Sequence, residues 1–291
     1  MAAWPIDRRQ RWPLCDDAPP MTYPWPPSIQ LGPLQLHVFG LMVGLAFVLG
    51  YESLRRIVRA SGHPQEFAST MFIAACLSGI VGSKLMYLVF HPPHSIGDVF
   101  SGNGFTWYGG LLGGALAIGV VRLRSKVPFT TMADLCSLPL LIGLAFGRLG
   151  CLLSADGDYG HPTSVPWAVA WPEGLVPTTV GSMNSYFGTN YSGAADRVLF
   201  VHPAPIYESI PLLLGALVLW RFRERLLVRP GMMFGCYAII AGAIRFGVEF
   251  VRFNDTVAAG LTLAQLISVV LMLIGVSMVI RASRHVPPAP I

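Results

Sequence analysis

Several ionisable residues lie inside long apolar stretches of the sequence, where a charged side chain is unexpected. They are Lys84, Arg148, Glu208, Arg245 and Glu249, with Arg252 at the edge of one stretch. A charge at the centre of a bilayer costs about 2.5–3.5 kcal/mol on insertion scales, so these residues are functional candidates. Bases outnumber acids in this set, and a guanidinium group in a medium of low dielectric constant binds phosphate well. The set therefore predicts a phosphate-bearing lipid as the ligand.

The arginines stand in two informative contexts. Arg245, Glu249 and Arg252 are spaced i, i+4, i+7, which predicts one shared helix face. Glu249 could instead have a purely structural role, in an ion pair that only holds helices together. Arg148 stands in the run GLAFGRLGC, whose glycines let a neighbouring helix or a ligand approach the backbone closely.

The run WYGGLLGG at 107–114 contains four glycines within one short apolar stretch. Gly109 and Gly110 indicate either close helix packing or a backbone that approaches a lipid head group together with Tyr108. The sequence leaves both interpretations open.

Two further motifs flank the longest connection between apolar stretches. In HPAPIYE at 202–208 the prolines favour a helix start, which places His202, Tyr207 and Glu208 near a membrane interface. A tyrosine there is also typical of an aromatic belt. In SADGDYG, Asp156 and Asp158 are either turn residues or part of a site.

Five cysteines show no CxxC and no metal-type spacing, so the sequence predicts neither a disulfide framework nor a metal site. Cys76, Cys136 and Cys236 lie in apolar runs and are interpreted as small packing residues. Cys151, one turn after Arg148, is either a packing thiol or a site residue.

The composition indicates that membrane-spanning helices carry the candidate site residues. Of the 291 residues, 53% are hydrophobic and only 12% are charged, about half the usual charged share of a soluble domain. That balance excludes a soluble two-domain enzyme, a disordered chain and a nucleic-acid binder. Apolar stretches of near spanning length occur at about 34–54, 68–90, 106–121, 132–153, 205–220, 232–251 and 261–280.

Basic residues follow every second stretch and predict the orientation. Twelve lie in these loops: Arg55, Arg56, Arg59, Arg122, Arg124, Lys126, Arg221, Arg223, Arg225, Arg229, Arg281 and Arg284. Cytoplasmic loops are enriched in Lys and Arg, so we expect the N-terminus outside and the C-terminus in the cytoplasm.

The expected fold is an all-α integral membrane protein with about seven transmembrane helices. We expect a Pro/Trp-rich lead-in at 1–33, helices one to four within 34–153, helices five to seven within 205–281 and a cytoplasmic tail at 282–291. The Gly-, Pro- and aromatic-rich connection at 154–204 is the one long enough to form a small extracytoplasmic head domain.

Five segments together resemble the prolipoprotein diacylglyceryl transferases of bacterial membranes. They are LGPLQLHVFGLM in the first stretch, WYGGLLGG, GRLG at 147–150 with the acidic stretch after it, HPAPIYE, and RFGVEFVR at 245–252. Their order and separations match the family from about residue 31 to 281.

The resemblance implies a reaction and a location. Such enzymes of the bacterial inner membrane transfer the diacylglyceryl group of phosphatidylglycerol to the lipobox cysteine of a prolipoprotein signal peptide and release glycerol phosphate, with no metal or other cofactor. Arg148 and Arg245 occupy the family's phosphate-stabilising positions, and Glu249 orients Arg245. Glu208, His202, Gly109, Gly110, Cys151 and Asp156 are implied substrate-binding positions.

The chain departs from the family's pattern at several positions. Tyr108 occupies the position of the histidine proposed to help deprotonate the thiol, so it is a predicted catalytic residue beside Arg148 and Arg245. A neutral phenol, with a pKa near 10, is a poor base at pH 7 unless neighbouring arginines favour phenolate. Cys151 replaces a usual asparagine, Phe39 a common tyrosine and Lys84 a common arginine. Three alternatives therefore stay open: another acceptor with a phospholipid donor, a non-catalytic lipid-binding membrane protein, and a transporter. The sequence leaves open the base, acyl-chain preference and oligomeric state.

Overall fold

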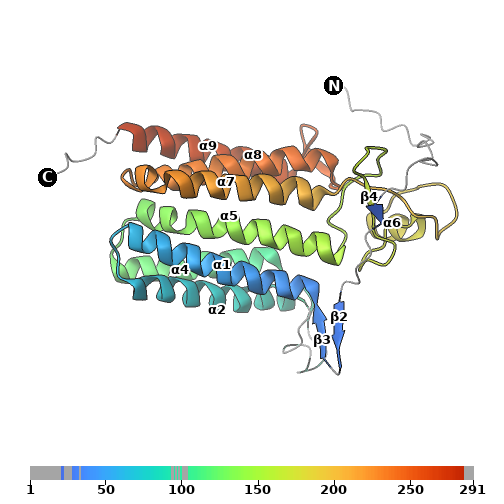
Figure 1. Ribbon diagram of the computed structural model, residues 1–291, viewed down its shortest axis with the longest axis horizontal. Coiled ribbons are helices and arrows are strands. Elements are labelled where there is room, and N and C mark those ends of the chain that lie inside the picture. The colour runs from blue at the N-terminus through green and yellow to red at the C-terminus, as the bar shows by residue number, and fades with distance from the viewer. Residues whose placement is uncertain are drawn as a thin grey trace.

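The computed structural model describes residues 21–22, 28–32, 34–92, 95, 97, 99 and 104–284. Most of the expected lead-in at 1–33 and of the tail at 282–291 lies outside these residues. The described chain is mainly helical (Figure 1). Its long helices are α1 (Val38–Ala60), α2 (Gln65–Phe90), α4 (Trp107–Ser125), α5 (Phe129–Ser154), α7 (Ala204–Leu227), α8 (Met232–Val248) and α9 (Leu263–Arg284).

Six of the long helices are long and apolar enough to cross a membrane, namely all except α4. Many large apolar side chains of the seven long helices are exposed, including Val89 on α2 at 74% and Leu116 on α4 at 71%. Large apolar side chains exposed along whole helices match a lipid-facing surface. The protein is therefore a multi-pass all-α membrane protein.

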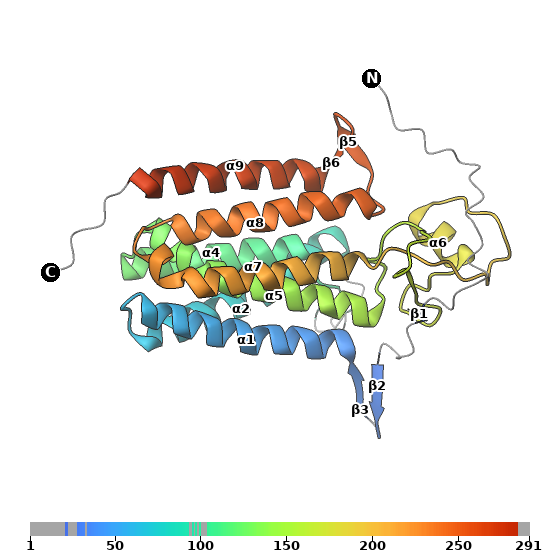
Figure 2. The same cartoon turned by 45° about the horizontal axis from the view of Figure 1, so that its top comes forward.

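The helices lie side by side with their long axes roughly aligned (Figures 1 and 2). α5 contacts α1, α7 and α8, α2 packs mainly on α4, and α9 packs on α8. The buried core along α5 includes Leu135, Leu138 and Leu141. Asp134 joins α5 to the start of α8, because its carboxylate accepts hydrogen bonds from the backbone N–H groups of Gly231 at 2.6 Å and Phe234 at 2.7 Å.

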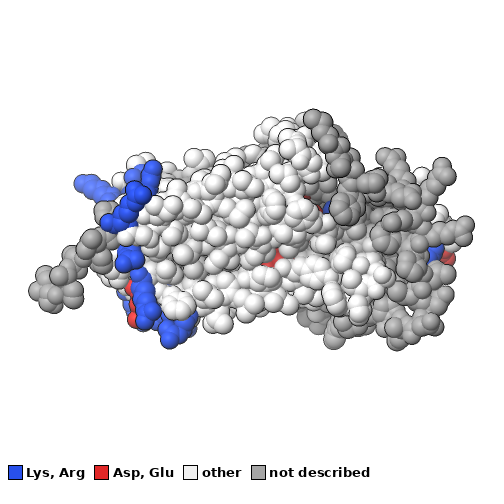
Figure 3. Space-filling model, turned by 90° about the horizontal axis from the view of Figure 1, so that it is seen from above, with Lys and Arg blue, Asp and Glu red and all other residues white. Residues whose placement is uncertain are grey.

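The two ends of the bundle differ in charge. Lys and Arg side chains gather at one end, which we call the basic end, while the face of the bundle seen in Figure 3 is almost free of charge. Basic residues occupy the last turns of α1, α4, α7 and α9, which all finish at that end. The prediction that the basic loops share one side is confirmed.

The opposite end carries the connection from α5 to α7. It contains β4 (Val169–Ala170), which pairs in parallel with β1 (Met21–Thr22), and the short helix α6 (Val180–Phe187). A second hydrophobic cluster holds it together, with Tyr159, Trp171 and Met183 among its buried residues. β2 (Ser28–Leu31) and β3 (Leu34–His37) form a hairpin before α1, so that helix begins four residues after the start of the expected stretch.

α8 ends earlier than the sequence pattern predicts. Val248 is its last residue, and a 3₁₀ turn (Glu249–Val251) follows. Arg252 is in an extended conformation, with φ −92° and ψ 159°. The expectation that Arg245, Glu249 and Arg252 share one α-helical face is therefore wrong for Arg252. Beyond it, β5 (Thr256–Ala258) pairs with β6 (Leu261–Thr262) before α9.

Candidate active site

Two of the predicted arginines converge on one buried carboxylate. Arg148 lies two turns before the end of α5, Arg245 lies in the last turn of α8, and Glu208 lies in the second turn of α7. Arg148 Nε is 3.0 Å from Glu208 Oε2, and Arg245 Nη1 is 3.5 Å from the same oxygen. Glu208 is 5% exposed. The N-terminal end of α7 thus brings together residues almost 100 positions apart in the chain.

Arg245 is also held by the first residue after its own helix. Its Nη2 is 2.8 Å from Glu249 Oε2, which confirms the predicted i, i+4 contact. The other Glu249 oxygen accepts hydrogen bonds from Asn254 Nδ2 at 2.7 Å and Thr262 Oγ1 at 2.8 Å. Glu249 is 3% exposed, so it is a fixed counter-charge for Arg245.

Asp158 completes the cluster from the loop after α5. Its carboxylate pairs with Arg148 Nη1 and, at 2.5 Å, with Arg252 Nη2. Burial works to raise the pKa of Asp158, but Arg148 and Arg252 outweigh it, so the pKa lies below its usual value. Asp158 is thus an ionised bridge between two guanidinium groups.

The loop that carries Asp158 is shaped by close backbone contacts. Ala155 and Gly157 have positive φ values of 48° and 97°. A Cβ atom at Gly160 would overlap the carbonyl oxygen of Val251 and lie 3.0 Å from His202 Cβ. The Gly160 N–H donates to the His202 carbonyl at 2.9 Å. These contacts place Asp158 beside the segment that follows α8.

The cluster is balanced in charge, which corrects the expected positive excess. Its members are three arginines and three carboxylates: Arg148, Arg245, Arg252, Asp158, Glu208 and Glu249. Lys84 lies elsewhere, on α2, with its Nζ 5.4 Å from the centre of the Phe105 ring. Asp158 follows the apolar stretch in the sequence, so a count of the ionisable residues inside the apolar stretches does not include it.

Hydrogen bonding within the cluster is nevertheless incomplete. Arg245 Nη1, Glu208 Oε2 and Glu249 Oε2 are buried, and none makes a hydrogen bond of normal geometry with the described residues. Their ion contacts are close in distance but poorly aligned. A buried donor without a hydrogen bond is costly, so Arg245 Nη1 has the capacity to bind a further acceptor.

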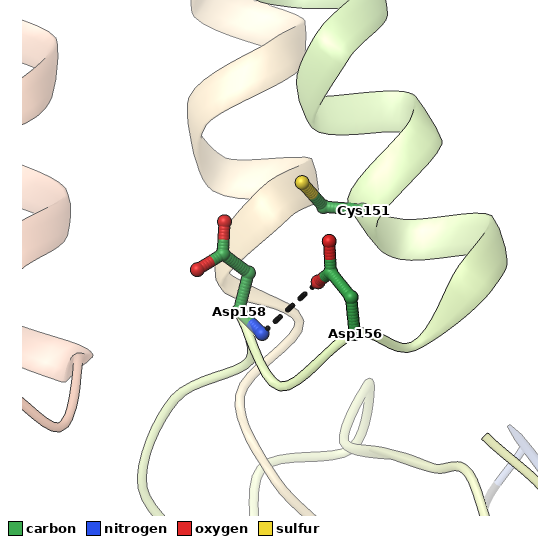
Figure 4. Close-up of side chains that lie close together, drawn as sticks. All are labelled: Cys151, Asp156 and Asp158. Atoms are coloured by element: carbon green, nitrogen blue, oxygen red, sulfur yellow. Dashed lines mark hydrogen bonds between the residues drawn. The ribbon is translucent and has the colours of Figure 1, made fainter. Parts of the chain in front are cut away.

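Two predicted residues lie next to the cluster. Cys151 and Asp156 approach Asp158, and the sulfur and carboxylate atoms of the three lie within 4.8 Å of one another (Figure 4). Asp156 accepts a hydrogen bond from the Asp158 backbone N–H at 3.2 Å. A cation held by these three would face Arg148 and Arg252, which already pair with Asp158, so their charge disfavours a metal site.

His202 lies beside the loop and not within the ion pairs. Its Nδ1 is 3.2 Å from the Tyr207 hydroxyl, which also accepts a hydrogen bond from Trp167 Nε1 at 2.6 Å. Burial lowers the pKa of His202, which favours a neutral ring at pH 7. His202 therefore adds no positive charge for a phosphate.

The glycines of WYGGLLGG lie against α2. A Cβ atom at Gly109 would overlap the carbonyl oxygen of Gly82, and one at Gly110 would lie 3.5 Å from that of Gly79. Both glycines thus serve close helix packing. Tyr108, 54% exposed, lies at the start of the same helix. The ion-pair cluster forms between other elements, namely α5, α7, α8 and the two loops described above.

Two members of the cluster are only weakly indicated by the sequence: Arg252 stands at the edge of an apolar stretch, and Asp158 could equally be a turn residue. The sequence does point to Arg252 as a site residue, because it belongs to the same charged motif as Arg245. For Asp158 the sequence shows only that it is a second acid in a glycine-containing loop.

Comparison with known proteins identifies the family. Residues 26–281 match the family model described as prolipoprotein diacylglyceryl transferase. The chain belongs to this family. A phosphatidylglycerol–prolipoprotein diacylglyceryl transferase of Geobacter sulfurreducens is 30% identical over 276 residues, covering 89% of this chain and 96% of the relative. The enzyme of that name from Xanthomonas campestris pv. campestris is 31% identical over 280 residues, covering 90% and 92%. Family membership agrees with the membrane fold and with the resemblance found in the motifs.

Proposed function

We propose that this protein transfers the diacylglyceryl group of phosphatidylglycerol to the lipobox cysteine thiol in a prolipoprotein signal peptide. The observation that carries the proposal is the convergence of Arg148 and Arg245 on Glu208, with Arg245 Nη1 buried and without a hydrogen bond. In a member of this transferase family, that unused donor is the natural partner of the lipid phosphate.

The arginines would act on the leaving group. The acceptor sulfur forms a bond to the glyceryl carbon while the bond from that carbon to the phosphate oxygen breaks, so negative charge grows on the departing glycerol phosphate. Donors fixed where charge develops stabilise a transition state. Arg148 and Arg245 are fixed by Asp158, Glu208 and Glu249, so little reorganisation is needed.

The bundle would be oriented with its basic end in the cytoplasm, the N-terminus outside and the C-terminus inside. In that orientation α4 is a seventh span, which its 19 residues and its packing on α2 support. The 155–203 segment is then an extracytoplasmic head domain, which its own hydrophobic cluster supports. The ion-pair cluster lies where the helices meet this segment, at a depth suited to a phospholipid head group.

The other predicted site residues differ in how far their surroundings support a role in the reaction. Asp156 and Cys151 lie beside Asp158, and His202 packs against the adjacent Gly160, which supports a role for all three in lining the site. Gly109 and Gly110 have a sufficient explanation in helix packing. A role for Tyr108 in deprotonating the thiol stays a prediction.

The test is an assay of the purified protein in vesicles of phosphatidylglycerol. A lipobox peptide is the acceptor, and the same peptide with serine in place of cysteine is the control. We expect the mass of a diacylglyceryl thioether on the cysteine peptide only, with one glycerol phosphate released per adduct. Glycerol phosphate released without a peptide adduct would indicate another acceptor. No product under conditions where the Geobacter relative is active would contradict the proposal.

A further inference from the structure

Asp156 differs from every carboxylate of the ion-pair cluster. Asp158, Glu208 and Glu249 each pair with at least one arginine. Within residues 104–284, Asp156 makes no ion pair; its Oδ1 accepts the Asp158 backbone N–H, and its side chain also contacts the Cys151 thiol. Its carboxyl group therefore lies next to the cationic groups of the site without forming an ion pair with any of them in this part of the chain.

A cavity opens on Asp156. Its volume is about 280 Å³, and it lies between the loop after α5, the end of α6 and the segment after α8. Its walls include Asp156, Asp158, Tyr186, Phe187, Arg252 and Asn254. Because Asp158 and Arg252 belong to both structures, the cavity joins the ion-pair cluster directly. A reactant in this cavity would meet Asp156 on its way to the arginines.

The surroundings of Asp156 already accommodate sulfur. The Cys151 sulfur lies within 4.8 Å of one carboxylate oxygen of Asp156 and one of Asp158, and Figure 4 shows the three side chains close together. The Asp156 carboxylate has more lone-pair sites than the Asp158 backbone N–H and the Cys151 thiol occupy, so it has capacity for a further hydrogen bond. The site therefore has space and polarity for an S–H group.

We propose that Asp156 is the catalytic base that takes the proton of the acceptor thiol in this cavity, an inference that rests on the proposed function. The Asp156 carboxylate removes the S–H proton, and the thiolate sulfur attacks the glyceryl carbon. The carbon–oxygen bond to phosphate breaks, and its electron pair leaves with glycerol phosphate. The proton passes from Asp156 to the leaving phosphate or to water, which restores the carboxylate. Asp156 thus supplies the proton acceptor that Tyr108 supplies poorly.

The electrostatic surroundings support this role. Burial first, and then the charge of Asp158, raise the pKa of Asp156, and a carboxylate with a raised pKa is a better base for a thiol. The titratable groups that face Asp156 or share its cavity are Cys151, Arg148, Asp158, Tyr159, Tyr186 and Arg252. The guanidinium groups among them stabilise the thiolate once it has formed.

The test compares acceptors that differ in their need for a base. The full-length protein is assayed from pH 6 to 9 with a cysteine lipobox peptide and with its selenocysteine analogue, whose selenol is already ionised at neutral pH. Asp156→Asn removes the base, and Asp156→Glu retains a carboxylate. Asp196→Asn makes the same chemical change at an exposed position of the 155–203 segment and is the matched control.

We expect Asp156→Asn to reduce turnover of the cysteine peptide about 10²–10⁴-fold at pH 7, the usual range for loss of a general base. The deficit should shrink toward pH 9, because a free thiol with a pKa near 8.5 ionises there. With the selenocysteine peptide the Asn variant should work at nearly the wild-type rate. Asp156→Glu should recover part of the lost activity, and Asp196→Asn should match the wild type.

Two results would overturn the inference: undiminished turnover of the cysteine peptide by Asp156→Asn, or an equal loss with both peptides at every pH. If the Asn variant does not fold, the wild-type pH profiles decide. The acidic limb seen with the cysteine peptide must be absent with selenocysteine, and an identical limb would exclude Asp156 as the base. If the wild type modifies neither peptide, the proposed function itself fails.

Discussion

The α2–α4 pair and the α5–α7–α8 group are held together in different ways. α2 and α4 meet through backbone, with glycines on both helices and Ser83 Oγ donating to the Thr106 carbonyl at 2.6 Å. The other three helices meet through buried ion pairs at one end of the bundle and an apolar core along their length. Glycine contacts bring helices together without leaving polar groups to react, whereas the ion pairs place incompletely bonded charges in a membrane protein. The α5–α7–α8 group therefore carries the groups that can react, and the α2–α4 pair serves as scaffold.

Among the substitutions that test this comparison, the largest effect is expected in the α5–α7–α8 group. Arg148→Ala should lower turnover in the thioether assay by about 10²–10³-fold, as expected for removing a donor to developing negative charge. Arg148→Lys should fall between this variant and the wild type, because an ammonium keeps the charge but loses the planar fork. Arg124→Ala, an exposed arginine at the basic end, is the control. Full activity of Arg148→Ala would remove the phosphate role from the cluster.

Folding must be measured alongside, because removing one partner of a buried ion pair costs about 3–5 kcal/mol. Thermal unfolding in detergent, followed by size-exclusion chromatography, separates lost protein from lost chemistry. If Arg148→Lys folds as well as the wild type but turns over more slowly, the geometry of the guanidinium is what the reaction needs.

Much of this charged group could be predicted from local patterns. The i, i+4 spacing of Arg245 and Glu249 predicts their ion pair, and the apolar stretches predict the helices that carry them. The equal number of arginines and carboxylates in the cluster could not be predicted. The Arg252–Asp158 pair joins residues 94 positions apart, and the loop that carries Asp158 contains two residues with positive φ values. Arg252 leaves the helix face because the chain changes from α to 3₁₀ geometry at Glu249, which the periodicity of side chains does not reveal.

A smaller effect is expected in the glycine-packed pair. A Cβ atom at Gly113 would overlap the carbonyl oxygen of Ser78, so Gly113→Ala should destabilise the protein by about 1–3 kcal/mol through overpacking. Gly119, on the same helix, has nothing within 4 Å of its Cβ position. Gly119→Ala should therefore stabilise the helix by up to about 1 kcal/mol. Opposite shifts in thermal unfolding, with unchanged turnover per folded molecule, would support a scaffold role for α4. Equal shifts would contradict the close contact.

The smallest expected effect tests whether α4 contributes any chemistry. Tyr108→Phe removes only a hydroxyl group from a side chain that is 54% exposed, on a helix that packs mainly on α2. If Asp156 takes the thiol proton, turnover of the cysteine peptide should stay within about twofold of the wild type at pH 7, since general-base loss costs about 10²–10⁴-fold. If turnover of the cysteine peptide fell by that larger factor while turnover of the selenocysteine peptide did not, Tyr108 on α4 would be the group that takes the thiol proton. The glycine-packed pair would then be part of the active site, and the division between scaffold and chemistry would fail at Tyr108.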